Sequence, residues 1–540
     1  MAANHDPSVV HPIDHDSDDH VNGKLVAPAI SAAADTAAAA SKKKKKHKHK
    51  NKSTAVPDQP SSSETALGPA PVSAPGLEPT SSSSSSSLRT IEDLFRKLAA
   101  ADAKPAQKSM DDYKFWKTQP VTRFDEKISD EGPIDPVKTP DDVPDSPLPL
   151  LAEFTWSSLD ISSADAITEI HDLLYSHYVE DADSTFRFNY SPQFLDWALR
   201  APGFKPDWFV GVRVTSTGKL VAFISGIPIR LRVRNTEFTA ADINFLCVHK
   251  KLRSKRLAPL LIKEVTRRVN KSGIWQALYT AGVVLPKPVS TCRYYHRSLN
   301  WAKLNDVGFS PLPPNQTRAA MIKKYHLPDS TVTPGLRLMQ PADIDQVFDL
   351  LIAYLSKFEL AQVFDKDELA HWLLHKNFNA QQNTNNELDP DRVVWAYVVE
   401  DPNNAGVITD FFSFYRLPST VIGNRLHDNI SIAYSFYYAS STSIDRPRDD
   451  KQATKNLQVR LIQIFNDSLI LAKNLSFDVF NALTLLDNPL FLDELKFGAG
   501  DGNLNYYLFN YKALPIAGGF DPDTGSLEKD SRSGVAVVML

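Results

Sequence analysis

Few of the features that mark secreted or membrane proteins occur in this sequence. Its 540 residues include two cysteines, Cys247 and Cys292, both in segments whose apolar character predicts a core position. Two cysteines are too few for a disulfide framework and suit a reducing cytosol. The sequence also lacks an N-terminal apolar signal segment and any apolar run long enough to span a bilayer. These absences predict a soluble cytoplasmic protein.

A large net charge is missing as well. The formal net charge at pH 7 is -4, so any strongly basic feature is local and the chain as a whole is not a polycation. Apolar residues, in contrast, make up 42% of the chain, which is ample for a core larger than one ordinary domain. The composition therefore predicts a large folded region with local charged features.

Residues 1–108 are predicted to form a disordered, low-complexity arm. Ala-rich and Ser-rich tracts surround a lysine run at 42–46, and this composition buries too little apolar surface to offset the entropy of ordering. Five adjacent like charges create a salt-sensitive affinity for polyanions, so contact with a ribosome or RNA is one interpretation and a solvated tail is the other. A short amphipathic helix is expected at 91–99, and order is expected to begin near the aromatic segment 113–116.

The segment 242–269 organises the rest of the chain. An apolar run at 243–248, rich in β-branched and aromatic residues, predicts a buried strand. A turn with five cations and no acid follows, and Pro259 then stands where the first turn of a helix is expected. This order favours an anion, because the helix dipole and the free backbone N–H groups add to the Lys and Arg charge. We expect a phosphate-binding site here.

An internal repeat of element order runs through the folded region. The amphipathic segments that begin at 159 and 339 are each followed by a short helix, several strands and a longer helix. Sequence identity between the copies is slight, so the repeat is one of element order and residue type. We expect two halves, 109–326 and 327–540. The second half has acids where the first has its cationic turn, so one phosphate site is expected, in the first half.

Three other residue patterns have simpler structural explanations. Cys247 lies among apolar neighbours with no evident general base, so a small core residue is favoured over an acyl nucleophile. His371 and His375 have i, i+4 spacing without a carboxylate partner, so a surface helix is favoured over a metal site. His296, in the run RYYHRS, is open to two interpretations, a general base or a hydrogen-bonding residue. No metal is expected.

The segment 253–258, Arg-Ser-Lys-Arg-Leu-Ala, resembles the acyl-CoA loop of GCN5-related N-acetyltransferases. That loop begins with Gln or Arg and has small residues at its fourth and sixth positions. Here Arg256 stands where the superfamily usually has glycine. Charge alone favours a solvated basic turn. The buried strand before the loop, Pro259 after it and the duplicated context favour the acyl-CoA loop.

Longer motifs extend the resemblance over 110–540. They are TQPV at 118–121, RFNYSPQFLDWAL at 187–199, INFLCVHKKLRSKRLAP at 243–259, YTAGVVLPKPVSTCRYYHRSLN at 279–300 and KFGAGDGNLNYYLFNY at 496–511. In this order, and with an apolar chain end, they resemble eukaryotic N-myristoyltransferases. The resemblance implies an α/β fold of two GCN5-related N-acetyltransferase-like halves, related by a pseudo-twofold axis around a saddle-shaped mixed sheet, in a monomer.

The implied activity is acyl transfer from myristoyl-CoA, as donor substrate, to the N-terminal glycine of proteins, with no permanently bound cofactor. The first half is implied to bind myristoyl-CoA and the second half to bind the peptide. Negative charge builds on the thioester oxygen during the reaction, and the resemblance places the backbone amides of Phe245 and Leu246 there. Lys114 stands where the family often has Gln. The residues implied at the acyl-CoA are Tyr113, Lys114, Phe115, Trp116, Phe245, Leu246, Cys247, Val248, Arg253, Ser254, Lys255, Arg256, Leu257, Ala258 and Pro259.

The acceptor amine needs a base, because an N-terminal ammonium is mostly protonated at pH 7. The chain ends in an apolar run, 534–540, so the terminal carboxylate of Leu540 is expected inside the protein. Sequence alone favours an ordinary terminal strand that seals the sheet. The resemblance instead makes this carboxylate the base, and burial should raise its pKa from about 3.5.

The resemblance also implies the peptide contacts. Asn244, Thr280 and Tyr178 are expected near the glycine amine and the acyl carbonyl, where a Cβ on the attacking residue would collide with the walls. Asp181 and Asp183 form an acidic loop suited to Lys or Arg later in a peptide that also carries a downstream Ser; without the resemblance, helix-end solvation explains them equally well. The rest of the groove is expected to include Phe186, Phe188, Tyr190, Tyr294, His296, Phe309, Ser435, Asp501, Gly502 and Leu504.

Two other functions stay open at this point. The first is a protein N-acetyltransferase that uses a short acyl chain. The second is a non-enzymatic ribosome or RNA-binding adaptor, for which the lysine run is the only support.

Overall fold

The computed structural model describes residues 109–136, 138–181, 184–374, 378–379, 384–385 and 387–540. The expected arm at 1–108, its lysine run and its helix at 91–99 lie outside the described residues, as do Asp183 and His375. The described residues open with the short 3-10 helices η2 (Met110–Asp112) and η3 (Trp116–Thr118), in and beside the aromatic segment 113–116.

The predicted repeat of element order is confirmed. Each half contains two helices before its central strands and one longer helix between a central strand and the next strand, which run parallel. The first set is β2 (Phe154–Ser158), α3 (Ala164–His177), α4 (Pro192–Leu199), β4 (Phe209–Val214), β5 (Leu220–Val233), β6 (Thr236–Val248), α5 (Leu257–Lys271) and β7 (Gln276–Ala281). The second set is β9 (Leu336–Leu338), α8 (Ile344–Leu355), α9 (Lys366–Leu374), β13 (Val394–Glu400), β14 (Ile408–Arg416), β17 (Ile432–Ser440), α10 (Lys451–Asn474) and β18 (Val479–Leu483).

The two halves share one mixed sheet and exchange their last strands. Its main path runs β2-β4-β5-β6-β7-β19-β8-β18-β17-β14-β13-β9. Strand β8 (Ser290–Ser298) follows the first set in the chain but pairs with β18 of the second, and β19 (Gly498–Phe509) follows the second set but pairs with β7 of the first. The exchanged strands pair with each other at the centre. This exchange joins the α/β halves into one body.

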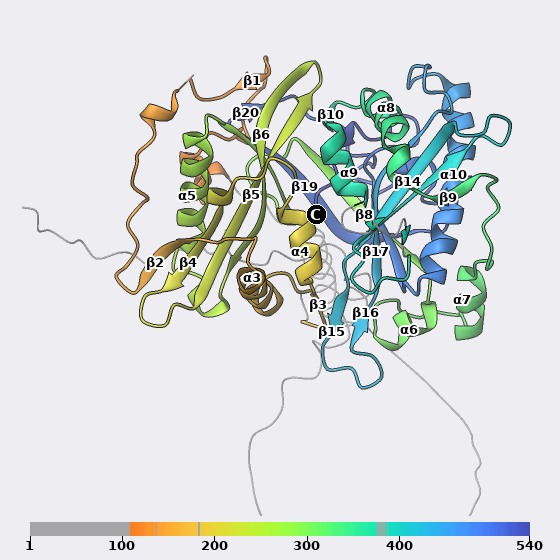
Figure 1. Ribbon diagram of the computed structural model, residues 1–540, viewed down its shortest axis with the longest axis horizontal. Coiled ribbons are helices and arrows are strands. Elements are labelled where there is room, and N and C mark those ends of the chain that lie inside the picture. Colours follow the sequence, from red (N-terminus) through yellow and green to blue (C-terminus); the bar gives the residue numbers. More distant parts are fainter. Residues whose placement is uncertain (1–108, 137, 182–183, 375–377, 380–383, 386) are drawn as a thin grey trace, which may run out of the picture. The chain divides into compact units, whose positions relative to one another are not determined.

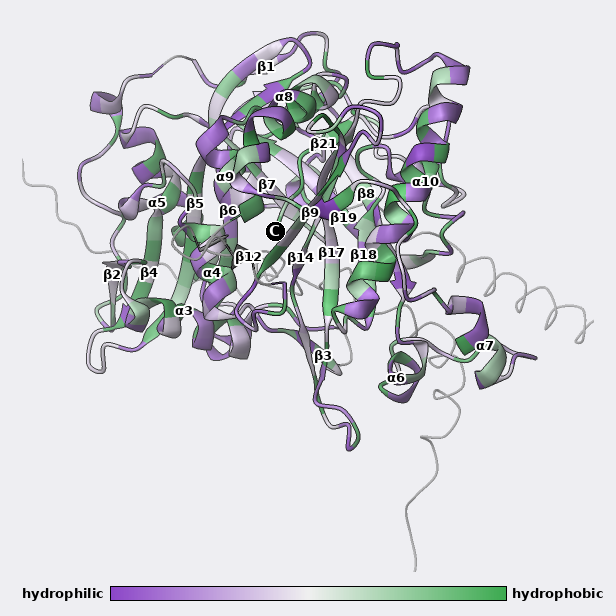
Figure 2. Cartoon of the chain, turned by 45° about the vertical axis from the view of Figure 1, so that its right-hand side comes forward, coloured by the Kyte–Doolittle hydropathy of each residue, from purple (hydrophilic) through white to green (hydrophobic). Residues whose placement is uncertain are grey.

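Helices cover both faces of the sheet. In the first half α5 packs on β4, β5 and β6 from one side, while α3 packs on β5 and β6. In the second half α10 and α8 both contact β14 and β17. Figure 1 shows α5 outside the first half and α10 outside the second, with the C-terminus between the two halves. In Figure 2 the strands are largely hydrophobic where they pack, and the outward helix faces are hydrophilic, which is the amphipathic pattern expected of helices on a sheet.

The remaining elements are short. Helices α6 (Trp301–Asp306) and α7 (Arg318–Tyr325) connect the halves. The 3-10 turns are η4 (Pro140–Asp142), η5 (Pro206–Trp208), η6 (Lys250–Leu252), η7 (Pro341–Asp343) and η8 (Asn488–Leu490). The minor strands are β1 (Gly132–Pro133), β3 (Phe186–Phe188), β10 (Leu360–Gln362), β11 (Phe378–Asn379), β12 (Thr384–Asn385), β15 (Ser419–Val421), β16 (Asn429–Ile430), β20 (Tyr511–Lys512) and β21 (Val535–Ala536). Among the described residues, no helix has the length and apolar character needed to cross a membrane.

A buried acid ties α5 to its surroundings. The fully buried Glu264 pairs with Arg267 at 2.8 Å and with Arg268 at 2.7 Å. The two arginines in turn donate to backbone carbonyls of the segments before β2 and before β4. Burial acts to raise the pKa of Glu264, but the hydrogen bonds and charges of the arginines outweigh it, and the pKa is lowered. The ionised carboxylate therefore stabilises the helix that begins at the basic turn.

Replacing Glu264 by Gln is expected to lower the free energy of unfolding by about 3–5 kcal/mol, because two arginines lose a buried counter-ion. The carboxylate's contribution is complete above the unfolded pKa of about 4.3 and is lost as the pH falls through the lowered folded pKa. The difference in the free energy of unfolding between wild type and variant should therefore become smaller at acid pH. Urea unfolding near neutral pH and at lower pH measures this. Asp145→Asn, which removes an exposed partner of Lys271, is the control; equal effects of the two substitutions would contradict the prediction.

Candidate active site

A large cavity opens where β6 and β7 separate. The two strands pair only at 240–242 and 276–278, and beyond these residues both of them line the cavity. Its empty volume is about 1570 Å³, including open solvent. Part of its wall is formed by apolar side chains of β5, β6 and α5, namely Ile224, Ile243, Ile262, Val265 and Val269. The cavity therefore offers a long apolar surface behind the central strand.

A β-bulge interrupts β6 at this cavity. Phe245 and Leu246 both lie opposite Ile224, and neither has a partner residue of its own on β5. Phe245 has a φ of 57°, in the left-handed region that non-glycine residues rarely adopt. Its amide hydrogen-bonds the hydroxyl of Tyr178, whose pKa burial raises well above the ordinary value. The bulge thus takes two residues out of one-to-one pairing with β5 at the cavity wall. Their backbone amides could bind a developing oxyanion once the Phe245 amide exchanges the Tyr178 hydroxyl for it.

Polar side chains surround the bulge. Asn244, Thr280 and Tyr178, which were expected near the reacting amine, all line the same cavity. The Ser225 hydroxyl donates to the Asn244 carbonyl at 3.0 Å, and the Asn244 side-chain amide donates to Asp242 at 2.9 Å. The orientation of Asn244 is therefore held from both its backbone and its side chain.

The basic turn connects the end of β6 to α5. Arg256 is the N-cap of α5 with a φ of 57°, and Ser254 has a φ of 68°. Glycine usually occupies positions with such a φ. This explains why the acyl-CoA loops that 253–258 resembles usually have glycine at the place of Arg256. The guanidinium of Arg253 donates to the His177 carbonyl at 2.6 Å, whereas Ser254, Lys255 and Arg256 are exposed. The exposed cations and the helix N-terminus form a surface suited to phosphate.

The aromatic segment 113–116 packs against the cavity from outside the sheet. Trp116 lies parallel to Tyr279 with ring centroids 5.4 Å apart and lines the cavity. The hydroxyl of Tyr113 donates to the Val284 carbonyl at 3.1 Å, and Phe115 contacts Trp116 edge to face. Lys114 is exposed. Three of these four side chains therefore anchor the segment beside β7.

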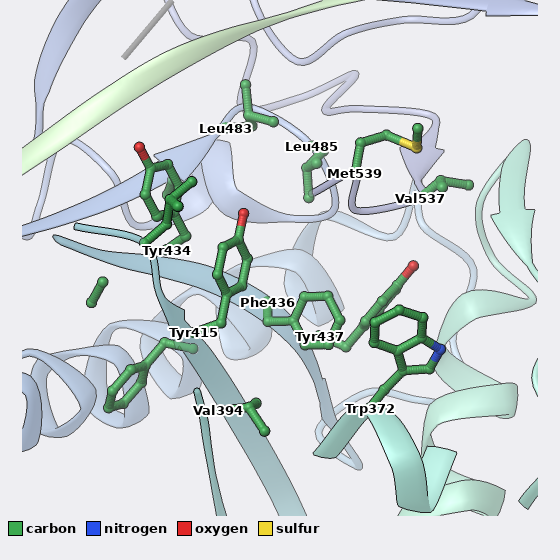
Figure 3. Packing of buried hydrophobic residues seen from close by; sticks show 14 of the residues in the cluster. Trp372, Val394, Tyr415, Tyr434, Phe436, Tyr437, Leu483, Leu485, Val537 and Met539 are labelled. Carbon is green, nitrogen blue, oxygen red and sulfur yellow. The ribbon is translucent and has the colours of Figure 1, made fainter. Parts of the chain in front are cut away.

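The chain end enters the same cavity from the second half. Strand β21 pairs in parallel with β10, and Met539 and Leu540 line the cavity. The Tyr506 hydroxyl donates to the Val537 carbonyl at 3.0 Å, and the Val538 amide donates to the Tyr437 hydroxyl at 3.1 Å. Figure 3 shows Val537 and Met539 packed with Tyr437 and other aromatic side chains of β17. The carboxylate of Leu540 thus ends a buried, hydrogen-bonded segment.

Pseudo-symmetry explains why the chain end fits there. Strand β17 carries a register shift opposite Ser413 that matches the β6 bulge opposite Ile224. Strands β17 and β18 also separate after a short parallel pairing. In this gap the amide of Leu486 donates to the Val535 carbonyl at 2.8 Å. The gap that holds the cavity in the first half is therefore filled by the chain's own end in the second.

Aromatic contacts join several of the expected groove residues into two groups, one of which reaches the bulge. Aromatic contacts link Phe309 to Phe186, and Phe188 to Tyr190 and then Phe245. Of this expected group, Phe188, Tyr190, Tyr294 and Leu504 line the cavity. Asp501 and Gly502 lie on β19, and Ser435 lies on β17.

His296 is a hydrogen-bonded residue with one free ring nitrogen. Its Nδ1 lies 2.7 Å from Asn481 Oδ1, while Nε2 is buried without a partner in the described part of the chain. Burial lowers the pKa of His296, against opposing effects of Asn481 and Asp501. Gly500 leaves the space beside Nε2 open, because a Cβ there would lie 2.5 Å from this nitrogen. This geometry favours contact with a polar ligand atom.

Asp181 is buried, unlike an acid on the surface of the protein. The residue is 7% exposed, and its carboxylate accepts the Phe186 amide at 2.7 Å. It therefore closes the turn before β3, and a direct ion pair with a peptide requires this turn to open. Nearby Glu180 is already paired with Arg187 and Lys250.

The alternative sites considered from sequence lack supporting geometry. Cys247 and Cys292 are buried free thiols, and burial raises the pKa of each to about 12. His371 lies on α9 with its Nε2 2.8 Å from the Trp197 carbonyl oxygen. Within the described ranges, no cluster of His, Cys, Asp or Glu could hold a metal ion.

Sequence reasoning did not single out several residues at the site. Tyr415 and Tyr434 line the cavity from the second half, and Tyr437 and Tyr506 hold the chain end. The aromatic density of 434–438 is a signal for a packed strand, but it does not distinguish which hydroxyl reaches the chain end.

Comparisons with known proteins identify the family of this chain. The N-terminal domain model of myristoyl-CoA:protein N-myristoyltransferase matches residues 133–292, and the C-terminal domain model of the same family matches residues 306–538. Glycylpeptide N-tetradecanoyltransferase of Candida albicans is 52% identical over 462 residues, which cover 85% of this chain and 98% of the relative. The Saccharomyces cerevisiae protein of the same name is 54% identical over 435 residues, covering 80% of this chain and 93% of the relative.

A solved structure extends the likeness to three dimensions. The crystal structure of Saccharomyces cerevisiae N-myristoyltransferase with bound myristoyl-CoA is similar with a TM-score of 0.76 and 54% identity. The match covers 80% of this chain and 100% of that chain. This chain therefore belongs to the myristoyl-CoA:protein N-myristoyltransferase family.

Proposed function

We propose that this protein transfers myristate from myristoyl-CoA to the N-terminal glycine amine of proteins. The observation that carries the proposal is that the bulge, an apolar wall and the chain end at Leu540 all line the same cavity. Relatives named glycylpeptide N-tetradecanoyltransferase, and a solved relative with bound myristoyl-CoA, support the same acceptor and donor.

The first half is proposed to hold the donor. The CoA phosphates would lie on the turn 253–258, where Lys255 and Arg256 are exposed and the N-terminus of α5 favours anions. The segment 113–116 would pack on CoA from the other side. The acyl chain would extend along the apolar wall, and each buried methylene contributes about 0.8 kcal/mol, so a myristoyl chain gains far more than an acetyl group.

The reaction is proposed to be direct attack of the amine on the thioester, without an acyl-enzyme. The amides of Phe245 and Leu246 would stabilise the oxyanion, and the Leu540 carboxylate would take one proton from the glycine ammonium. The C–N bond then forms, the C–S bond breaks, and the CoA thiolate receives the second proton released by the nitrogen. Products are an amide and CoA thiol.

The peptide groove is proposed to take residues from both halves: the second half, expected to bind the peptide, supplies Ser435, Asp501, Gly502 and Leu504, and the first half supplies the rest. Asn244, Thr280 and Tyr178 surround the reacting amine closely enough that a side chain on the first residue would collide with them, which selects glycine. The free Nε2 of His296 would contact a downstream polar group such as Ser. The loop of Asp181 and Asp183 is proposed to favour downstream Lys or Arg.

We place this activity in the cytoplasm and in a monomer. The lysine run at 42–46 is proposed as a ribosome contact.

A parallel acyl-transfer assay tests this function. Myristoyl-CoA and acetyl-CoA are each incubated with peptides that differ only in a first residue of Gly or Ala, and the acylated product is measured by mass. Myristoylation of the Gly peptide alone is the expected result. Faster acetyl transfer would favour an N-acetyltransferase. Removal of residues 1–108 should leave turnover in vitro intact, whereas an adaptor that acts through the lysine run would lose its function.

A further inference from the structure

A carboxylate that the proposed mechanism does not use lies next to the reacting groups. Asp242 precedes Asn244 by two residues on β6, and its Oδ2 accepts the Asn244 side-chain amide at 2.9 Å. The other oxygen, Oδ1, is buried and has no hydrogen-bond partner in the described ranges. An unpaired buried carboxylate oxygen is costly and calls for an explanation.

Among the described residues, no cation neutralises Asp242 through an ion pair. Across from β6, Tyr437 of β17 interacts electrostatically with Asp242 and with Glu368 of α9. Arg230 of β5 acts on Glu368, and no described cation forms an ion pair with Asp242. Burial raises the pKa of Asp242 to about 7, although the Asn244 hydrogen bond opposes this shift. The carboxyl group therefore changes charge near neutral pH.

Asp242 also connects the cavity wall with the segment that precedes the chain end. On one side its hydrogen bond reaches Asn244, which lines the cavity. On the other side is Tyr437, whose hydroxyl accepts the Val538 amide two residues before the chain end. A role in core packing alone does not explain this position, because a packing residue would have both carboxylate oxygens satisfied.

From this geometry we infer that Asp242 is a positioning residue for the acceptor: it orients the Asn244 amide and supplies negative charge that binds the N-terminal ammonium of the peptide. This inference rests on the proposed function. Only the nitrogen of an Asn amide can donate to a carboxylate. Its bond to Asp242 therefore directs the Asn244 side-chain carbonyl oxygen away from Asp242, where it can accept a hydrogen bond from the ammonium.

The test compares two peptides that differ only at the amine. One begins with glycine, and the other has the amino group replaced by hydrogen; both are titrated into the protein saturated with a non-reactive myristoyl-CoA analogue. Asp242→Asn is expected to reduce the preference for the amine peptide by about tenfold, the size expected for loss of a hydrogen bond to a charged group. Asp242→Glu, which retains the charge, should restore part of the preference.

Controls separate positioning from folding. Glu368→Gln neutralises another acid beside Tyr437 that does not contact Asn244, and it should leave the amine preference unchanged. Unchanged affinity for the myristoyl-CoA analogue reports an intact site in each variant. If Asp242→Asn fails to fold, the comparison is made with Asp242→Glu and with Asn244→Ala. In protein that already carries Asn244→Ala, a further change at Asp242 should have little effect on the preference for the amine peptide.

The pH dependence gives a second readout. As pH rises through about 7, Asp242 becomes charged, so kcat/KM of the wild type for glycyl peptides should rise and this step should be absent in Asp242→Asn. An unchanged amine preference together with an unchanged pH profile would overturn the inference while myristoyl transfer by the wild type continues. No transfer by the wild type would overturn the proposed function instead.

Discussion

Blocking the carboxylate of Leu540 should lower kcat by about 10²- to 10⁴-fold, the range expected for a positioned general base. The carboxylate is at the end of a segment that two tyrosine hydroxyls hold at Val537 and Val538, beside the cavity. An exposed α-carboxyl has a pKa of about 3.5, which makes it a weak base in water. Burial should raise this pKa, and the fixed geometry should make proton transfer efficient.

Semisynthesis permits a matched comparison at this position. One protein ends in the amide of Leu540, a second carries one extra glycine, and a third has Leu540→Ala with a free carboxylate. The first two should lose turnover while binding myristoyl-CoA normally, and the third should keep most of its turnover. Single-turnover kinetics measures the chemical step, and the same rate in the amide and the carboxylate proteins would refute the base.

Replacing the Leu246 amide by an ester should lower kcat by about 10²- to 10³-fold, as removal of one oxyanion donor does in other acyl-transfer sites. The ester keeps the shape of the chain and deletes one N–H. The bulge is the reason for a large effect, because Leu246 has no partner residue of its own on β5. The loss should therefore affect kcat more than the affinity for donor or peptide.

An ester at Ala240 is the control for the loss of a ladder amide. Ala240 lies on the same strand and pairs with Ile229 of β5. This change should lower stability by about 1 kcal/mol with little effect on kcat, because the amide contributes one ordinary hydrogen bond. Equal loss of kcat in both ester proteins would argue that the strand has simply been weakened.

The bulge also illustrates how strain is held at a site. The left-handed conformation of Phe245 costs about 1–3 kcal/mol and persists only where the surroundings enforce it. Its ring contacts Tyr178 and Tyr190, with centroids 6.2 and 5.4 Å away. Packing with these two aromatic residues offsets the strain and fixes the direction of the amides.

Local patterns predicted a large part of this protein. The apolar run before the cationic turn and Pro259 after it correctly indicated β6, the turn and α5, because strand and helix periodicity depend on neighbours in the chain. The same reasoning identified the duplicated order of elements. A family resemblance, and not periodicity, selected Phe245, Leu246 and Leu540, since no local pattern marks a bulge or a chain end that enters a cavity.

Long-range contacts decided the rest. The exchange of β8 and β19 between the halves joins residues far apart in the chain, and so do the contacts of Tyr437 and Tyr506 with the chain end. By itself the sequence determined the elements, their repeat and the position of the one cationic turn. Only the tertiary structure decided that the chain end fills the gap between β17 and β18, whereas the gap between β6 and β7 stays open. Packing between distant segments, rather than local preference, selects what occupies each gap.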